Sequence, residues 1–235
     1  MDQRNQAARV AGVLYLTIVL TGIFNLIYVP GRLIVRGNAA ATASNILASP
    51  LLFRANMVIA LASSVVFLFL GLALYRLLKE VNRPLALLMV VLALIQVPLA
   101  TVDELAQNAA LILLQGPDYL SVFTGPQRQA LAMFCLDLNS KGNVASELFW
   151  GLWLFPLGLL VFRSGFLPRI IGLWLILNCF AYAAVSFTGM LFPQYLERAN
   201  KIASPALMGE LAFMLWLLIF GARPAPVRKS SDPSS

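Results

Sequence analysis

Histidine is absent from this 235-residue sequence, and cysteine occurs only twice, as Cys135 and Cys179. Without histidine, haem-type ligation, histidine–zinc sites and Ser-His catalytic triads are excluded. We expect one cysteine in an outer loop and the other within an apolar run, so the two supply neither a disulfide framework nor a ligand set. A metal would have to be held by carboxylates alone. We therefore expect no catalytic residue set, no metal site and no cofactor.

Charge is also scarce, because only 11% of the residues are charged while 60% are hydrophobic. Soluble domains carry about 25% charged residues. A bilayer core of about 30 Å requires about 20 apolar helical residues. The sequence has six apolar runs of roughly that length, at 7–29, 57–75, 85–102, 144–162, 170–192 and 206–222. The sequence therefore predicts an all-α, polytopic membrane protein, with a single domain of six transmembrane helices over residues 1–222.

The net charge of +7 raises the question of a nucleic-acid partner, which the positions of the basic residues argue against. Lys and Arg flank the spans and are more numerous on the side that holds the amino terminus, the connections 76–83 and 163–169 and the tail. Positive residues favour the cytoplasmic side of a membrane. We predict that both termini are cytoplasmic, that residues 223–235 form a disordered tail, and that lipids, not nucleic acid, are the partners.

Two local features refine the predicted spans. The run 7–29 is longer than the roughly 7–15 apolar residues of a signal peptide, so we interpret it as an uncleaved first span. Between the third and fourth spans, residues 126–139 place Leu131, Phe134, Cys135 and Leu138 at helical spacing. This stretch is too short and too polar to cross a bilayer. We predict a short amphipathic helix that lies in the outer interface.

Four carboxylates lie in or beside the apolar runs: Asp103, Glu104, Glu147 and Glu210. An ionisable group inside a bilayer is costly and suggests a functional site. The apolar run after Glu210 rises about 18 Å and the run after Glu147 about 22 Å, both less than the core thickness. These two carboxylates are therefore predicted to be submerged. Asp103 and Glu104 follow about 27 Å of apolar helix, so we expect them near the outer boundary.

Neutral polar residues accompany the carboxylates in the outer half of the spans, whereas the inner halves of spans two to four are almost purely apolar. Gln96, Asp103 and Gln107 share one helical stripe. This asymmetry predicts a water-accessible cavity that opens to the outer side. The candidate ligand-binding residues are Glu147, Glu210, Asp103, Gln107, Tyr182 and Asn25. The alternative is that these side chains reach the headgroups, cap helices or join helices by hydrogen bonds.

An aromatic-rich string, residues 149–158, follows Glu147. Gly151 and Gly158 in this string would allow a neighbouring helix to approach closely. Several shorter patterns elsewhere in the chain accompany it. The patterns are Arg9-x-Ala11-Gly12-x2-Tyr15-Leu16, residues 74–79 with Asn82-Arg83, the string 149–158 continuing to 163–169, and Gly209-Glu210-Leu211. Together they resemble the bacterial membrane-protein family called domain of unknown function 4386. The resemblance implies a small protein of the bacterial cytoplasmic (inner) membrane, and it implies no substrate, cofactor or catalytic residue.

Three functions stay open from the sequence. The first is a binding or transport protein, not an enzyme, in which Glu147 and Glu210 hold a cationic or hydroxylated ligand or carry protons. Six short spans make a small transporter, so this function would call for a homo-oligomer. The second is a structural or regulatory membrane partner without a ligand. The third is an intramembrane enzyme that acts on lipid or isoprenoid substrates, for which the lack of histidine is unfavourable. The deciding observation is whether Glu147 and Glu210 face one cavity.

Overall fold

The computed structural model describes residues 3–222, and all regular elements within that range are helical. The predicted disordered tail, 223–235, lies outside the described residues. Along the chain the elements are α1 (Gln3–Ile23), η1 (Phe24–Tyr28), α2 (Val29–Leu33), α3 (Ala39–Ala48), α4 (Pro50–Leu78), α5 (Arg83–Gln115), η2 (Asp118–Leu120), α6 (Gly125–Leu152), α7 (Leu154–Arg163), α8 (Arg169–Leu191), η3 (Pro193–Tyr195) and α9 (Leu196–Ile219).

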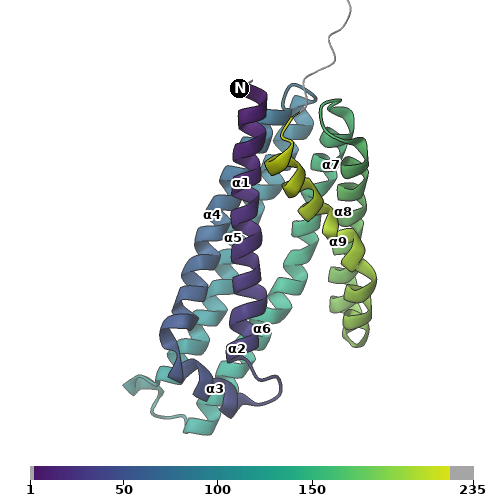
Figure 1. Ribbon diagram of the computed structural model, residues 1–235. Helices are drawn as coiled ribbons and strands as arrows, with labels where there is room; N and C mark the ends of the chain where they lie inside the picture. Colours follow the sequence, from purple (N-terminus) through teal and green to yellow (C-terminus); the bar gives the residue numbers. More distant parts are fainter. Residues whose placement is uncertain (1–2, 223–235) are drawn as a thin grey trace, which may run out of the picture.

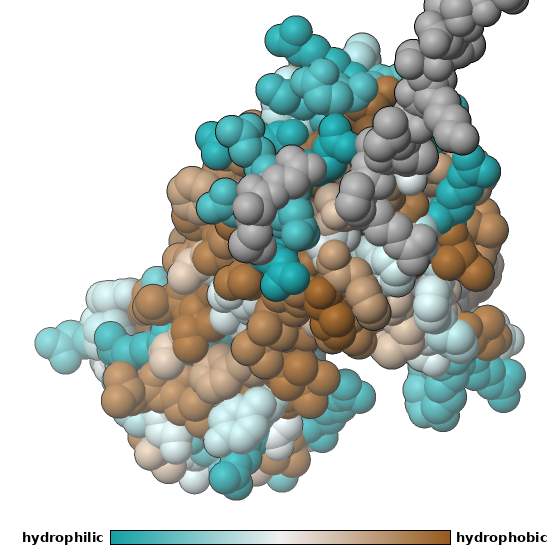
Figure 2. Space-filling model, turned by 45° about the horizontal axis from the view of Figure 1, so that its top comes forward, coloured by the Kyte–Doolittle hydropathy of each residue, from teal (hydrophilic) through white to brown (hydrophobic). Residues whose placement is uncertain are grey.

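Six stretches are long and apolar enough to cross a membrane, which confirms the predicted polytopic helical bundle. They are Gln3–Leu33, Pro50–Leu78, Arg83–Gln115, Gly125–Arg163, Arg169–Leu191 and Pro193–Ile219. Hydrophobic side chains cover the middle of the molecular surface, and hydrophilic ones gather toward its ends (Figure 2). This distribution suits a protein whose flank faces lipid.

The six spans form a closed ring in which α1 contacts α4, α4 contacts α5, α5 contacts α6, α6 contacts α8, α8 contacts α9, and α9 returns to α1. The N-terminus and the C-terminal end of α9 lie at one end of the bundle, which we call the terminal end (Figure 1). The helix α3 lies at the opposite end, which we call the α3 end. The two ends differ in how the ring is filled.

Side-chain caps fix where several helices begin. The Asn38 side chain accepts a hydrogen bond from the Ala41 amide at the start of α3, at 2.9 Å. Asn82 does the same for α5, where it accepts from the Leu85 amide at 3.0 Å. At α6, Thr124 and the residue three positions on form a reciprocal capping box. Such caps satisfy amides that the first helical turn leaves without partners.

Two helices differ from the prediction. The helix α3 was not expected, because an alanine-rich connection gives no amphipathic signal and only its Asn38 cap marks a start. The predicted separate interfacial helix over 126–139 is wrong: these residues are the first half of α6, which continues without a break to Leu152. Ala132 and Leu136 of this half are buried in a small apolar cluster with residues of α2, α3, α4 and α5. Residues 126–139 thus extend a spanning helix and pack against the bundle, and they do not form a helix of their own.

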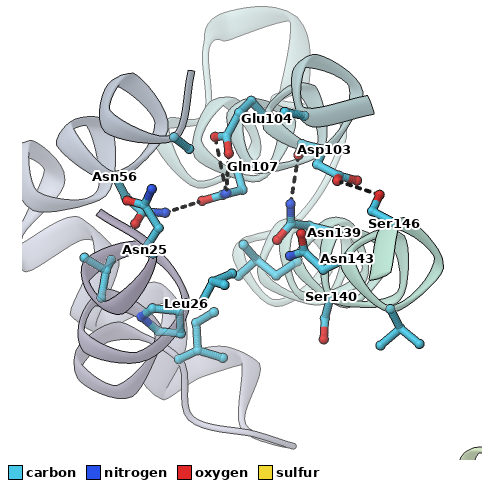
Figure 3. Close-up of a pocket in the computed structure, with 18 of the residues that line it drawn as sticks. Asn25, Leu26, Asn56, Asp103, Glu104, Gln107, Asn139, Ser140, Asn143 and Ser146 are labelled. Atoms are coloured by element: carbon cyan, nitrogen blue, oxygen red, sulfur yellow. Dashed lines mark hydrogen bonds between the residues drawn. The ribbon is translucent and has the colours of Figure 1, made fainter. Parts of the chain in front are cut away.

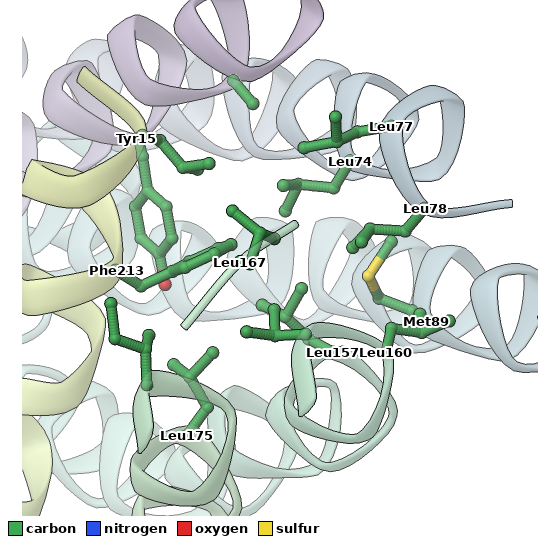
Figure 4. Close-up of a cluster of buried hydrophobic side chains, with 14 of the residues drawn as sticks. Tyr15, Leu74, Leu77, Leu78, Met89, Leu157, Leu160, Leu167, Leu175 and Phe213 are labelled. Atoms are coloured by element: carbon green, nitrogen blue, oxygen red, sulfur yellow. The ribbon is translucent and has the colours of Figure 1, made fainter. Parts of the chain in front are cut away.

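The terminal half of the ring is filled by a continuous apolar core (Figure 4). Its fully buried members include Leu70, Leu74, Met89, Leu157 and Leu175. The predicted close approach at Gly158 is confirmed, because a Cβ added there would stand 2.7 Å from the Gly172 carbonyl oxygen of α8. This half is therefore closely packed from one helix to the next.

Candidate functional site

A cavity of about 1390 Å³ occupies the α3 half of the ring. Its walls come mainly from α1, η1, α2, the connection 34–37, α4, α5 and α6, with one residue from α3, one from α8 and two from α9. Ligand sites typically enclose about 300–1,000 Å³, so the space is ample for a small molecule. All six residues predicted from the sequence line this one cavity: Asn25, Asp103, Gln107, Glu147, Tyr182 and Glu210.

Trp153 separates the cavity from the apolar core. It lines the cavity, yet its side chain is only 1% exposed and belongs to the core as well. The Phe67 ring packs edge-on against it with centroids 4.8 Å apart, and the Tyr15 ring lies 6.1 Å away on a tilted plane. Phe67 and Trp153 form the inner end of the cavity, and Tyr15 packs behind them in the core.

Glu210 lies at this inner end, where it is surrounded by donors from two other helices. The Tyr15 hydroxyl of α1 donates a hydrogen bond to Oε2. The Asn178 amide of α8 donates to Oε1 at 3.3 Å. The Tyr182 hydroxyl lies within interaction range of the same carboxyl group. Both Glu210 oxygens are therefore already engaged by neutral side chains.

Glu147 is arranged differently. Its Oε2 is buried and has no hydrogen-bond partner among the described residues. Tyr182 lies within interaction range of both Glu147 and Glu210. The two glutamates that the sequence predicted to be submerged thus line the same cavity.

A row of three hydrogen-bonded side chains from α4 and α5 forms another part of the cavity wall (Figure 3). The Asn56 amide of α4 donates to Gln107 Oε1 at 3.1 Å, and the Gln107 amide donates to both oxygens of Glu104 at 3.2 and 3.3 Å. Glu104 is only 9% exposed. The helix α5 continues past Glu104 to Gln115, and both Asp103 and Glu104 lie along the cavity wall.

Asp103 joins α5 to α6. Ser146 Oγ donates to Asp103 Oδ2 at 3.5 Å, and the Asn139 side chain donates to the Asp103 backbone carbonyl at 2.9 Å. A Cβ at Gly142 would overlap the Asp103 carboxylate. Glycine at this position therefore lets the carboxylate lie directly on the α6 backbone (Figure 3).

Asn25 enters the cavity from η1, a π-helical turn. The Val29 amide donates to the Phe24 carbonyl, five residues back, and Pro30 has no amide hydrogen to continue the α-helical pattern. Single π-helical turns often mark functional sites. Asn25 Oδ1 is buried and has no partner in the described part of the chain.

Buried oxygens without partners gather around this cavity. Besides Glu147 Oε2 and Asn25 Oδ1, they include Asn56 Oδ1 and Ser63 Oγ, and all four residues line the cavity. Nearly all buried polar groups in native proteins are hydrogen-bonded to protein or water. The four oxygens come from η1, α4 and α6, so they surround the space from several sides.

The charge of the cavity lining is strongly unbalanced. Its acidic residues are Asp103, Glu104, Asp137, Glu147 and Glu210, whereas Arg36 is the basic residue. The ion pairs found in residues 3–222 are Lys79–Glu80 and Lys201–Glu197, neither of which involves a cavity residue. Within the same residues no three His, Cys, Asp or Glu side chains converge on a common point where a metal could be held.

Several residues of the site have no direct signal in the sequence. Tyr15 appeared in the resemblance pattern, but a single tyrosine within an apolar run does not reveal its partner. Ser63 is equally ambiguous, since a serine inside a span is common. Asn56 lies near the start of a span, and the sequence does not report the register of α4 against α5 that places it beside Gln107.

Comparison with known proteins gives a family and nothing closer. A family model described as domain of unknown function (DUF4386) matches residues 10–221. No curated protein and no solved structure matches the chain.

Proposed function

Since the chain belongs to the DUF4386 family, which is described only as a domain of unknown function, its function has to be argued from the cavity, and we propose that it binds a small polar ligand inside the membrane. The four unpartnered buried oxygens carry this proposal. Leaving such a group without a partner costs about 1–3 kcal/mol. A fold that keeps four of them around one space gains stability when a ligand with hydrogen-bond donors fills it.

The proposal includes an orientation. With both termini in the cytoplasm, as the distribution of Lys and Arg favours, the α3 end faces the outside of the cell. The ligand then enters from the outer side of a bacterial cytoplasmic membrane. Binding requires no movement of the terminal half. Transport to the cytoplasm would require the core around Trp153 and Leu157 to open.

Access from the outside is tested by cysteine labelling. In a Cys135→Ala/Cys179→Ala background, Asn143→Cys places a thiol on the cavity lining and Glu80→Cys places one at the exposed hairpin of the terminal end. A membrane-impermeant thiol reagent is added to intact cells and to permeabilised cells. We expect Asn143→Cys to react in both, and Glu80→Cys to react only after permeabilisation.

A matched control is Leu157→Cys, which lies in the packed core and is expected to stay unlabelled. If Asn143→Cys stays unlabelled in both preparations, the cavity is not reachable and the binding proposal is overturned. That result would favour the alternative of a structural or regulatory partner without a ligand. If the two accessible positions react in the reverse order, the proposed orientation is wrong.

A further inference from the structure

We infer that the ligand is a protonated organic amine with N–H donors and an apolar body, and that Glu147 accepts its ammonium group. This inference rests on the proposed function and names the chemical class of the ligand. It is argued from charge, from the partners of each carboxylate, from the kind of unpartnered atom and from the apolar lining.

The sign of the ligand charge follows from the lining. Five carboxylates face the cavity against one arginine, and none of the five is ion-paired within residues 3–222. Opposite charges attract more strongly in a low-dielectric interior than in water. A buried charge without a partner is costly, and a cationic ligand removes that cost. An anionic ligand would add to it.

Glu147 is the carboxylate best placed to take the ammonium group. Glu210 accepts from Tyr15 and Asn178, and Glu104 accepts from Gln107 at both oxygens. Asp103 accepts from Ser146. Glu147 Oε2 alone among these carboxylate oxygens is both buried and without a partner in the described chain.

The unpartnered atoms also specify hydrogen-bond donors on the ligand. Glu147 Oε2, Asn25 Oδ1 and Asn56 Oδ1 are acceptors only. Asn56 is 4% exposed and lines the cavity, and its Oδ1 is buried without a partner among residues 3–222. A primary ammonium carries three donors, whereas a quaternary ammonium carries none. The acceptors therefore favour a protonated amine over a quaternary one.

The apolar body follows from the aromatic lining near Glu147. Trp150 lies three residues after Glu147 on α6, which places it on the same helix face, and it lines the cavity. Phe67, Trp153 and Tyr182 line the inner end. An ammonium next to an indole ring gains a cation–π interaction, and these rings would cover the carbon skeleton of an amine.

The test is a ligand series of one skeleton bound to the purified full-length protein in lipid nanodiscs. The probes are 2-phenylethylammonium, its N,N,N-trimethyl analogue and the neutral 2-phenylethanol, with n-butylammonium and tryptammonium to vary the apolar size. Binding is followed by calorimetry and by tryptophan fluorescence, since Trp150 and Trp153 line the cavity and their emission should change when a ligand binds. We expect the primary ammonium to bind at least about tenfold more tightly than the trimethyl analogue or the alcohol, a difference of about 1.4 kcal/mol.

Variants assign the residue. We expect Glu147→Gln to weaken the primary ammonium at least about tenfold. The matched control is Glu197→Gln, an exposed carboxylate of α9 that does not line the cavity, and we expect it to bind like wild type. Equal weakening by both variants would mean that ligand affinity responds to the overall charge of the protein and not to a contact with Glu147. That result would overturn the assignment to Glu147.

Other outcomes separate this inference from the proposed function. If the alcohol or the trimethyl analogue binds wild type as tightly as the primary ammonium, the inferred ligand class is wrong while the cavity still binds ligands. The same holds if no ammonium in the series binds at millimolar concentration and Asn143→Cys is labelled from outside. The wild-type series decides the ligand class even if Glu147→Gln does not fold. Only an unlabelled Asn143→Cys would overturn the proposed function itself.

Discussion

Individual polar side chains in this bundle divide into those that join helices and those with buried oxygens that have no partner within residues 3–222. Tyr15 is the clearest of the first kind, because its hydroxyl on α1 reaches Glu210 on α9 and its ring is 2% exposed. Glu147 is the clearest of the second kind. Mutation should separate the two roles, since loss of a joining residue lowers stability and loss of a free acceptor lowers binding.

Tyr15→Phe removes the hydroxyl and keeps the ring. Because Glu210 would lose a buried donor, we expect the free energy of unfolding to fall by about 1–3 kcal/mol, seen as a lower melting temperature in detergent. Tyr119→Phe is the control, since Tyr119 is 70% exposed in η2 and should melt like wild type. Equal melting temperatures for the two variants would contradict a joining role for Tyr15.

Gln107→Leu tests the second joining row. Gln107 accepts from Asn56 and donates to Glu104, so leucine leaves an amide and a carboxylate without partners at once. We expect a loss of about 1–3 kcal/mol per unpaired group, measured by thermal melting. Gln115→Leu, at the exposed end of the same helix, serves as the control. A Gln107→Leu protein as stable as the control would show that the row contributes nothing.

Helices were predictable here to the extent that their signal lies in apolar runs. The runs located all six spans, because a bilayer requires long apolar stretches whatever the packing. The helical period placed Gln96, Asp103 and Gln107 on one face, and all three line the cavity. The continuity of α6 and the presence of α3 depended on contacts with other helices, which periodicity does not report. Hydrogen-bond partners across helices could not be predicted for the same reason.

Gly158→Ala probes how closely two helices pack. A Cβ at Gly158 of α7 would stand 2.7 Å both from the Gly172 carbonyl oxygen and from Ile176 Cγ1 of α8. Since a backbone atom cannot move aside easily, we expect a loss of about 1–3 kcal/mol in unfolding free energy. Gly22→Ala is the matched control, because nothing lies within 4 Å of that added Cβ. Alanine in a helix interior should there stabilise by up to about 1 kcal/mol, so a loss at both positions would contradict the packing argument.

The whole molecule combines a packed half and a hollow half within one ring of helices. The terminal half holds the continuous apolar core, and the α3 half holds the cavity (Figure 4, Figure 3). A closed terminal half with an open α3 half is the arrangement that the proposed binding of a ligand at the α3 end requires. It also predicts opposite responses to changes of side-chain volume at the two ends.

Leu157→Ala removes volume from the packed half, and Ala100→Leu adds volume to the hollow half. Leu157 is fully buried in the core, so its truncation should cost about 2–5 kcal/mol, whereas Leu88→Ala on the exposed surface of α5 should cost far less. Ala100 lines the cavity, so a larger side chain there has space. We expect Ala100→Leu to melt within a few degrees of wild type and to bind 2-phenylethylammonium more weakly. Overpacking a filled core costs about 1–3 kcal/mol. A clear drop in melting temperature for Ala100→Leu would therefore mean that the space beside Ala100 is filled in the membrane. The cavity could not then serve as the ligand site.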